Sequence, residues 1–191
     1  MRDVLEIRTD RLTLRRPRHE DAQRIAAFTS DPAVARNVAR IPLPNPQVAV
    51  EGWLMILRAR APLGADHVFA IEAEGQGLVG LMGAHGAVAW ADAPGAVEIG
   101  YWIGRPHWGR GYASEALNAF VGEAQSLGPL EAGHFVDNPA SGRVLEKAGF
   151  VYTETLTDLF SLGRGVRVPS RRMRFDPQRW RAGSRVREAA L

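Results

Sequence analysis

The sequence predicts a single mixed α/β domain of the α+β type, with a central sheet of about seven strands and about four helices. Strand-like and helix-like stretches alternate along the chain, and one strand pattern at residues 97–103 leads through a tight glycine turn into a helix. The length of 191 residues suits one sizeable core with a short tail. We therefore assign residues 1–176 to the domain and residues 177–191 to an arginine-rich C-terminal tail.

The N-terminal half is expected to contain one strand, two helices and three further strands. Residues 12–16 alternate like an edge strand, and residues 19–34 carry apolar side chains at helical spacing. Asn45 and Pro46 are read as the N-cap and first residue of a helix that ends near Ala61. The three strands are expected at residues 68–73, 77–84 and 96–103, with turns at 74–77 and 92–95.

The C-terminal half continues with a helix, a strand, a helix and two strands. The first helix follows the glycine turn, places Leu117, Phe120 and Val121 on one face, and stops at residues 128–129. A short strand is expected at 130–136 and a short helix at 140–148, ended by Gly149. The final pair of strands runs to about residue 175.

The glycine turn, WGRGYA at residues 108–113, is the most informative local feature. Its small residues allow backbone N–H groups to close around an anion at the positive end of the following helix. A dinucleotide fingerprint is not met, because Ser114 replaces its third glycine, and a P-loop is excluded because Lys147 is the only lysine of the chain. Taken alone, the turn is also compatible with a plain strand-to-helix connection.

Together with residues 138–150, NPASGRVLEKAGF, this turn resembles the GNAT superfamily of acyl-CoA-dependent N-acetyltransferases. Within this superfamily, the residues of the two motifs resemble those of the branch of ribosomal-protein N-terminal acetyltransferases. The superfamily loop Q/R-x-x-G-x-G/A binds the coenzyme A pyrophosphate; here Trp108 stands first, as is familiar in this branch, and Gly111 and Ala113 stand last. The resemblance includes residues 11–15 and extends to about Asp176.

The resemblance implies acetyl-CoA as co-substrate, with no metal. It also implies that the fourth and fifth strands of the sheet splay apart and that the pantetheine arm pairs with exposed backbone of the fourth, whose N–H groups would supply the oxyanion donors. The residues implied in cofactor binding are Tyr101, Trp102, Ile103, Trp108, Gly109, Arg110, Gly111, Tyr112, Ala113, Ser114, Asn138 and Ser141. Asn138, which precedes a proline at a helix start, is also a natural N-cap.

Acetyl transfer requires a group that removes a proton from the attacking amine. Glu98 is the only acid in an otherwise apolar strand, and alternation places it on one face with Gly100 and Trp102. A partly buried acid at that point is suited to accept a proton, although a salt-bridged strand residue is the alternative interpretation. His107, beside Pro106 in a loop, is the second candidate and is expected to be exposed.

The departing thiolate also needs support. Many members of the superfamily carry a tyrosine in the helix after Asn138 for this purpose, but this chain has Leu145 at that position. Ser141 carries the only hydroxyl of the segment and is therefore the candidate hydrogen-bond donor to the sulfur, with an ordinary first-turn helix residue as the alternative.

Composition excludes several other chemistries. The chain has no cysteine, so an acyl-cysteine intermediate, a thiolate metal site and a disulfide framework are ruled out. Arginine makes up 23 of the 24 basic residues, which explains a pI near 9.9 beside a net charge of only +3. A nucleic-acid partner is therefore not expected. The arginine-rich end is interpreted as a disordered or solvated tail, with binding of RNA or an acidic protein as the alternative. His67, His85 and His134 show no metal-ligand spacing and are expected to be structural, whereas Trp53 and Trp90 are core residues or acceptor-pocket walls.

We expect transfer of an acetyl group from acetyl-CoA to a primary amine by direct attack in a ternary complex. The acceptor is either a protein N-terminus or a small-molecule amine such as a polyamine, an aminoglycoside or an amino-acid derivative, and fold analogy does not choose between them. A non-catalytic acyl-CoA-binding regulatory domain is the third hypothesis. With neither a signal peptide nor an apolar run that spans a bilayer, we expect a cytoplasmic protein. The sequence is compatible with a monomer or a homodimer and does not choose between them.

Overall fold

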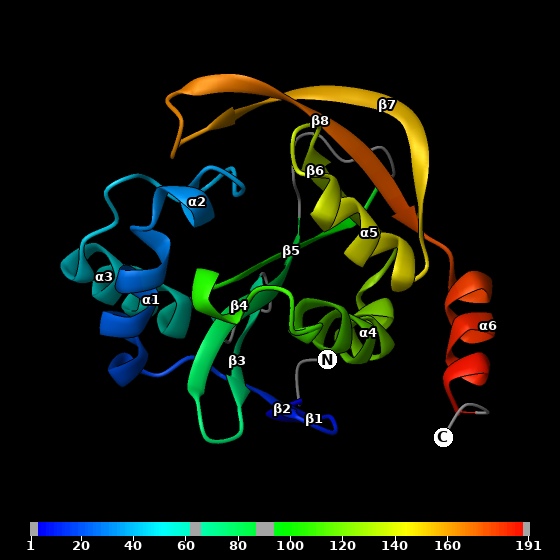
Figure 1. Cartoon of the computed structure of the whole chain (residues 1–191), viewed down its shortest axis with the longest axis horizontal. Coiled ribbons are helices and arrows are strands. Elements are labelled where there is room, and N and C mark those ends of the chain that lie inside the picture. The colour runs from blue at the N-terminus through cyan, green and yellow to red at the C-terminus, as the bar shows by residue number, and fades with distance from the viewer. Residues whose placement is uncertain (1–3, 62–65, 87–93, 189–191) are drawn as a thin grey trace.

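The computed structural model describes residues 4–61, 66–86 and 94–188, with side chains described as far as residue 183. These residues form one mixed sheet, flanked by helices (Figure 1). The strands are β1 (Glu6–Arg8), β2 (Leu12–Arg15), β3 (Asp66–Ala73), β4 (Gly77–Gly86), β5 (Val97–Ile103), β6 (Leu130–Phe135), β7 (Phe150–Ser161) and β8 (Val166–Phe175). The helices are α1 (Ala22–Thr29), α2 (Pro32–Ala35), α3 (Gln47–Arg60), α4 (Tyr112–Ala124), α5 (Pro139–Lys147) and α6 (Pro177–Glu188).

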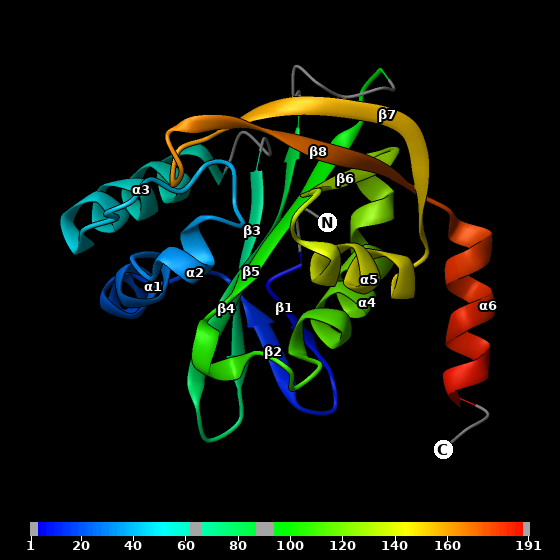
Figure 2. The ribbon, with the colours of Figure 1, turned by 45° about the horizontal axis from the view of Figure 1, so that its top comes forward.

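The sheet has the strand order β1-β2-β3-β4-β5-β6-β8-β7, and its neighbours are antiparallel except for the parallel pair β5 and β6. Helices α1, α2 and α3 lie on one side of the sheet, and α4 and α5 lie on the other (Figure 2). The expected mixed fold is therefore confirmed, and the chain crosses the sheet between β5 and β6 through α4.

Each face of the sheet has its own apolar core. Val97, Ile99 and Ile103 of β5 pack in the larger core with Phe120 of α4, whereas Trp102 packs in the smaller core under α1 and α3. Successive strand residues point to opposite faces, so β5 contributes to both layers. The alternation predicted for this strand is confirmed.

The β5–β6 pairing is short, and this opens the sheet. The two strands pair at Val97 with Leu130, at Glu98 with Glu131 and at Ile99 with Ala132. Beyond these pairs β5 stays with β4 as far as Ile103, while β6 stays with β8. The backbone of residues 100–103 consequently has no strand partner on its β6 side, which is the expected splay of the fourth and fifth predicted strands.

The structure corrects three details of the N-terminal half. The sheet has eight strands among the described residues, whereas about seven were predicted; the additional strand is the three-residue edge strand β1. Residues 19–34 form two helices instead of one: Asp31 caps α2 by accepting from the Ala33 N–H at 2.8 Å, and Pro32 begins it. The N-cap of α3 is Pro46, and the Asn45 side chain instead donates to the Thr29 hydroxyl at 2.9 Å.

The C-terminal segment also differs from the expected disordered or solvated tail, because residues 177–188 form helix α6. Trp180 anchors the helix: its indole N–H donates to the Asn118 side chain at 2.9 Å, and its ring lies 6.2 Å from the ring of Phe175. The partly buried indole of Trp180 therefore helps to order a segment whose composition is otherwise typical of a solvated chain. No helix within the described ranges is long and apolar enough to cross a bilayer.

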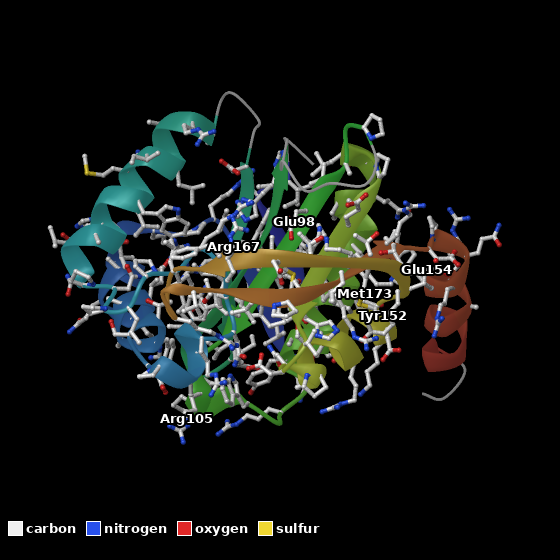
Figure 3. All side chains as sticks on the ribbon, turned by 90° about the horizontal axis from the view of Figure 1, so that it is seen from above. Glu98, Arg105, Tyr152, Glu154, Arg167 and Met173 are labelled. Carbon is white, nitrogen blue, oxygen red and sulfur yellow. The ribbon has the colours of Figure 1, made fainter. Side chains whose placement is uncertain are left out.

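Strands β7 and β8 form a long hairpin that arches across the molecule above Glu98 (Figure 3). Its tip contacts the segment after α2, where the Leu162 N–H donates to the Ala39 carbonyl at 2.9 Å. Arg164 at the tip and Arg36 both bind the Asp137 carboxylate, at 2.8 and 3.0 Å. The Arg164 hydrogen bond is the main reason why the pKa of Asp137 lies below its usual value. The hairpin tip is therefore held both by the segment after α2 and by Asp137, which follows β6.

Candidate active site

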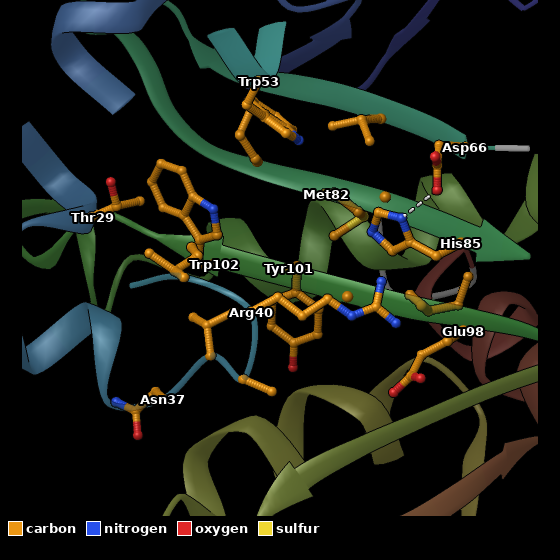
Figure 4. A pocket seen from close by; sticks show the side chains of 18 of the residues that line it. Thr29, Asn37, Arg40, Trp53, Asp66, Met82, His85, Glu98, Tyr101 and Trp102 are labelled. Carbon is orange, nitrogen blue, oxygen red and sulfur yellow. Dashed lines mark hydrogen bonds and ion pairs between the residues drawn. The ribbon is translucent and has the colours of Figure 1, made fainter. Parts of the chain in front are cut away.

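A cavity of about 760 Å³ extends from the helices α1 and α3 across β4 and β5 to α5 and β8 (Figure 4). Its described lining includes Glu98, Tyr101, Trp102 and Ser141. Four of the residues singled out in the sequence therefore meet in one place. His107 and the glycine turn are not part of this lining.

Side chains from β4 and β5 form the floor of this cavity. The antiparallel register places His85 opposite Glu98, Gly83 opposite Gly100, and Leu81 opposite Trp102. Residues that are directly opposite share a face of the sheet, so the two glycines lie between the polar pair, His85 and Glu98, and the apolar pair. A Cβ added to Gly100 would meet nothing within 4 Å. The floor is therefore open at Gly100, beside the β5 backbone that lacks a partner on its β6 side.

Glu98 is held by a buried arginine from the hairpin. Arg172, only 1% exposed, donates to the Glu98 carboxylate at 3.0 Å, and its second terminal nitrogen lies 3.9 Å from the Glu131 carboxylate. The ion pair expected from the alternative interpretation of Glu98, as a salt-bridged strand residue, is therefore present. One guanidinium therefore faces two carboxylates, so Glu98 shares the charge of Arg172 with Glu131.

His85 is a candidate that the sequence analysis did not select. Its Nδ1 lies 2.9 Å from Asp66, whose other carboxylate oxygen lies 3.7 Å from Arg60. Its Nε2 lies 3.1 Å from the point that a Cβ on Gly83 would occupy, over the floor. The carboxylate fixes the ring so that Nε2 faces the cavity. The signal that could have found His85 is strand register, because only the β4–β5 pairing places it opposite Glu98.

His107 is buried, not exposed as expected. Its Nδ1 is 3.1 Å from the Gln76 side-chain oxygen, and its ring packs edge-on against Phe28 at 5.5 Å. Burial, with smaller contributions from Arg24 and Arg110, lowers its pKa. The structure therefore places the imidazole of His107 between Gln76 and Phe28 and does not bring it to the cavity.

Ser141 and Tyr101 bring two hydroxyl groups together in the splayed region. The Tyr101 hydroxyl lies 2.9 Å from the Ser141 Oγ and donates to the Ser141 carbonyl at 3.1 Å. Burial raises the pKa of Tyr101 far above its ordinary value, so the phenol stays protonated. The Asn138 side chain accepts from the Ser141 N–H at 3.3 Å, which confirms the N-cap. Leu145 is fully buried in the core and leaves no acid at that position.

The glycine turn has the expected backbone form. Gly109 and Gly111 have φ values of +75° and +80°, a region that favours glycine, and α4 begins at once with Tyr112, followed by Ala113 and Ser114 in its first turn. Gly111 is the N-cap and offers no side chain to the first N–H groups of α4. These N–H groups point along the positive end of a 13-residue helix.

Gln76, from the β3–β4 turn, fastens the glycine turn from outside and was not singled out in the sequence. Its oxygen accepts from Arg110 at 2.9 Å, and its nitrogen donates to the Tyr112 hydroxyl at 2.9 Å. On the other side, the Trp108 indole N–H donates to the Ile103 carbonyl at 2.6 Å. The turn is therefore tied both to β5 and to the β3–β4 turn.

Two further expectations concern aromatic and metal-binding side chains. Trp53 lines the cavity from α3, whereas Trp90 lies outside the described residues. Within the described ranges, no group of three or more His, Asp or Glu side chains is placed to hold a metal ion.

Residues 11–151 match the family profile of the Acetyltransferase (GNAT) domain. The uncharacterised N-acetyltransferase p20 of Bacillus licheniformis is 30% identical over 153 residues, which cover 78% of this chain and 84% of that protein. The uncharacterised N-acetyltransferase YoaA of Bacillus subtilis strain 168 is 34% identical over 151 residues, with 75% of this chain and 81% of that protein covered.

Solved structures share the fold. RimJ of Mycobacterium smegmatis, determined in complex with CoA-disulfide, superimposes with a TM-score of 0.75 at 23% identity, over 94% of this chain and 89% of that chain. The ribosomal-protein-S5-alanine acetyltransferase of Vibrio fischeri gives a TM-score of 0.72 at 17% identity, over 91% of this chain and 98% of that chain. The family profile spans well over half of the chain, and the two Bacillus relatives cover most of it, so the chain belongs to the GNAT acetyltransferase family.

Proposed function

We propose that this protein transfers an acetyl group from acetyl-CoA to a primary amine in a ternary complex. The observation that carries the proposal is the open floor at Gly100, which lies beside β5 backbone without a partner on its β6 side and next to a carboxylate, Glu98. A thioester laid along residues 101–103 has its carbonyl within reach of backbone N–H groups, while the amine approaches over the floor. The pyrophosphate then lies at the glycine turn, on the first N–H groups of α4.

The reaction needs few side chains. The amine nitrogen attacks the thioester carbon, the new C–N bond forms, and the C–S bond then breaks to release the coenzyme A thiolate. We assign the proton lost by the amine to Glu98, and the hydrogen bond to the departing sulfur to Ser141. The buried Tyr101 hydroxyl holds Ser141 in place. His107 has no part in this scheme, because the structure keeps it outside the cavity.

Replacement of Ser141 by alanine tests the second assignment. The hydrogen bond strengthens as charge builds on sulfur, so its loss in Ser141→Ala should lower kcat and kcat/KM together. The expected decrease corresponds to an activation barrier that is about 1–3 kcal/mol higher. The loss should shrink with an acyl donor whose thiol is more acidic. Lower thermal stability with intact turnover would instead assign Ser141 to the helix start, where its N–H binds Asn138.

Replacement of Gly100 by valine tests the position of the acceptor. Because an added Cβ meets nothing within 4 Å, Gly100→Val should leave the fold intact and fill the floor. We expect kcat/KM for the amine to fall about 10- to 200-fold, the range for a misfit of methyl size, with little change in acetyl-CoA affinity. Gly52→Val in α3, where a Cβ also meets nothing within 4 Å, is the control. Equal activity of the two variants would show that the acceptor does not bind over Gly100.

The acceptor that we propose first is a protein N-terminus, with a small-molecule amine as the second candidate. Relatives of similar fold include a ribosomal-protein-S5-alanine acetyltransferase and a spermidine N-acetyltransferase, so the scaffold is compatible with both. A non-catalytic acyl-CoA-binding domain would be favoured by a buried Glu98 ion pair without a channel to the thioester; the ion pair is present, but so is the cavity. Turnover of acetyl-CoA against N-terminal peptides, polyamines and aminoglycosides separates these hypotheses.

A further inference from the structure

We infer that the acceptor amine is carried on an apolar, aromatic or branched body and has no second positive charge. This inference rests on the proposed acetyl transfer and narrows its substrate. It excludes polyamines and aminoglycosides, and it is drawn from the walls and the charges of the cavity.

The walls on the proposed acceptor side are mainly apolar. Trp53 of α3 and Trp102 of β5 both present their rings to the cavity (Figure 4), and Ile25, Val50 and Leu81 line the same part, together with the polar pair Thr29 and Asn45. Trp102 is 8% exposed, whereas Trp53 is 37% exposed, a high value for an indole that lines a cavity. An apolar group placed between the two rings would cover this surface, and the removal of apolar surface from water favours binding.

The charges of the lining oppose a polycation. Among the described lining residues, the guanidinium groups are those of Arg40, Arg60 and Arg172, and the carboxylates are those of Asp66 and Glu98. Both carboxylates already face an arginine, at 3.7 Å for Asp66 and at 3.0 Å for Glu98. The further ammonium groups of a polyamine or aminoglycoside would have to compete with these arginines for the two carboxylates, and an ammonium group beside a guanidinium group is a like-charge contact that disfavours the ligand.

Two sources present such an amine: a polypeptide whose first residue is apolar, and a free arylalkylamine. Steady-state assays at one pH and ionic strength should compare a peptide that begins with phenylalanine, phenethylamine and spermidine. We expect kcat/KM for at least one of the two apolar acceptors to exceed that for spermidine by about tenfold or more, and the better of the two identifies the source. Higher salt should reduce this difference in kcat/KM, because it screens the repulsion between the arginines of the lining and the ammonium groups of spermidine. Higher kcat/KM for spermidine would overturn the inference.

Trp53→Ala provides a test within the chain. It should lower kcat/KM for the preferred apolar acceptor about tenfold or more and leave the KM of acetyl-CoA unchanged, because the indole is a wall for the acceptor alone. Met55→Ala is the matched control, since Met55 lies on the same helix, is 69% exposed and is not part of the lining. Identical kinetics of the two variants would contradict the assignment of Trp53.

Calorimetry keeps this inference separate from the proposed function. If acetyl-CoA binds and none of the three amines is acetylated, the proposed transfer is wrong. Binding of phenethylamine, the phenylalanine peptide and spermidine to the protein with coenzyme A then still decides the charge and apolarity argument. Tighter binding of spermidine than of either apolar amine would overturn it under those conditions too.

Discussion

Glu98→Gln is expected to lower kcat by about 10²–10⁴-fold, the usual contribution of a general base, with acetyl-CoA affinity nearly unchanged. Glutamine keeps an oxygen that can accept the Arg172 hydrogen bond at the same position, so the fold should tolerate the change. It cannot take up a proton. The pH dependence of kcat/KM should accordingly lose its acidic limb, and stopped-time assays across the pH range will show this.

His85→Gln is the matched comparison, because His85 lies directly opposite Glu98 in the β4–β5 ladder. In our account this second variant keeps the acidic limb and loses less activity than Glu98→Gln. A loss of less than about threefold for Glu98→Gln, together with a large loss for His85→Gln, would assign the proton to the imidazole that Asp66 orients.

Gly111→Asp and Ala113→Asp are expected to abolish acetyl-CoA binding. A carboxylate at either position enters the space proposed for the pyrophosphate, and like charges at close range in a partly buried site cost several kcal/mol, or a factor of about a hundred or more in Kd. Isothermal calorimetry with coenzyme A measures the effect directly. Unchanged affinity for coenzyme A in both variants would show that the glycine turn does not bind the cofactor.

The two variants differ in their effect on stability, and this separates binding from folding. Gly111 has a φ of +80°, so aspartate there is strained, whereas Ala113 lies in the first turn of α4, where an acid stabilises the helix. Ala113 also packs partly against the larger core, so Ala113→Asp should lose less thermal stability than Gly111→Asp, without keeping its affinity for coenzyme A. Ala113→Asn, similar in size but uncharged, is the control and should retain most of the affinity.

Local patterns predicted the elements of this fold well. The alternation in β5, the glycine turn before α4 and Gly149 after α5 each depend on neighbouring residues alone, and each is present in the structure. The exceptions have physical causes. Edge strand β1 is only three residues long and has a single apolar residue, Ile7, which is too little to define an alternation. Helix α6 is ordered by tertiary contacts of Trp180, which the local sequence does not show.

The site was less accessible to sequence reasoning, because it depends on contacts between distant segments. Glu98 and Ser141 could be selected from strand alternation and from the motif after Asn138. Arg172, which is 74 positions from Glu98 in the chain, reaches it only because β8 pairs beside β6. His85 faces Glu98 only through the strand register. A single sequence without such pairings does not show these partners.

The central claim is that an amine meets the acetyl group over the open floor at Gly100. The most direct measurement incubates the protein with acetyl-CoA and an amine and quantifies free coenzyme A thiol and N-acetylated amine in the same sample. Our account predicts equal amounts of the two products from the wild-type protein and a strong reduction of both in Gly100→Val, which still binds acetyl-CoA. Tight acetyl-CoA binding without acetylation of any peptide or small amine would contradict the account and leave an acyl-CoA-binding regulatory domain.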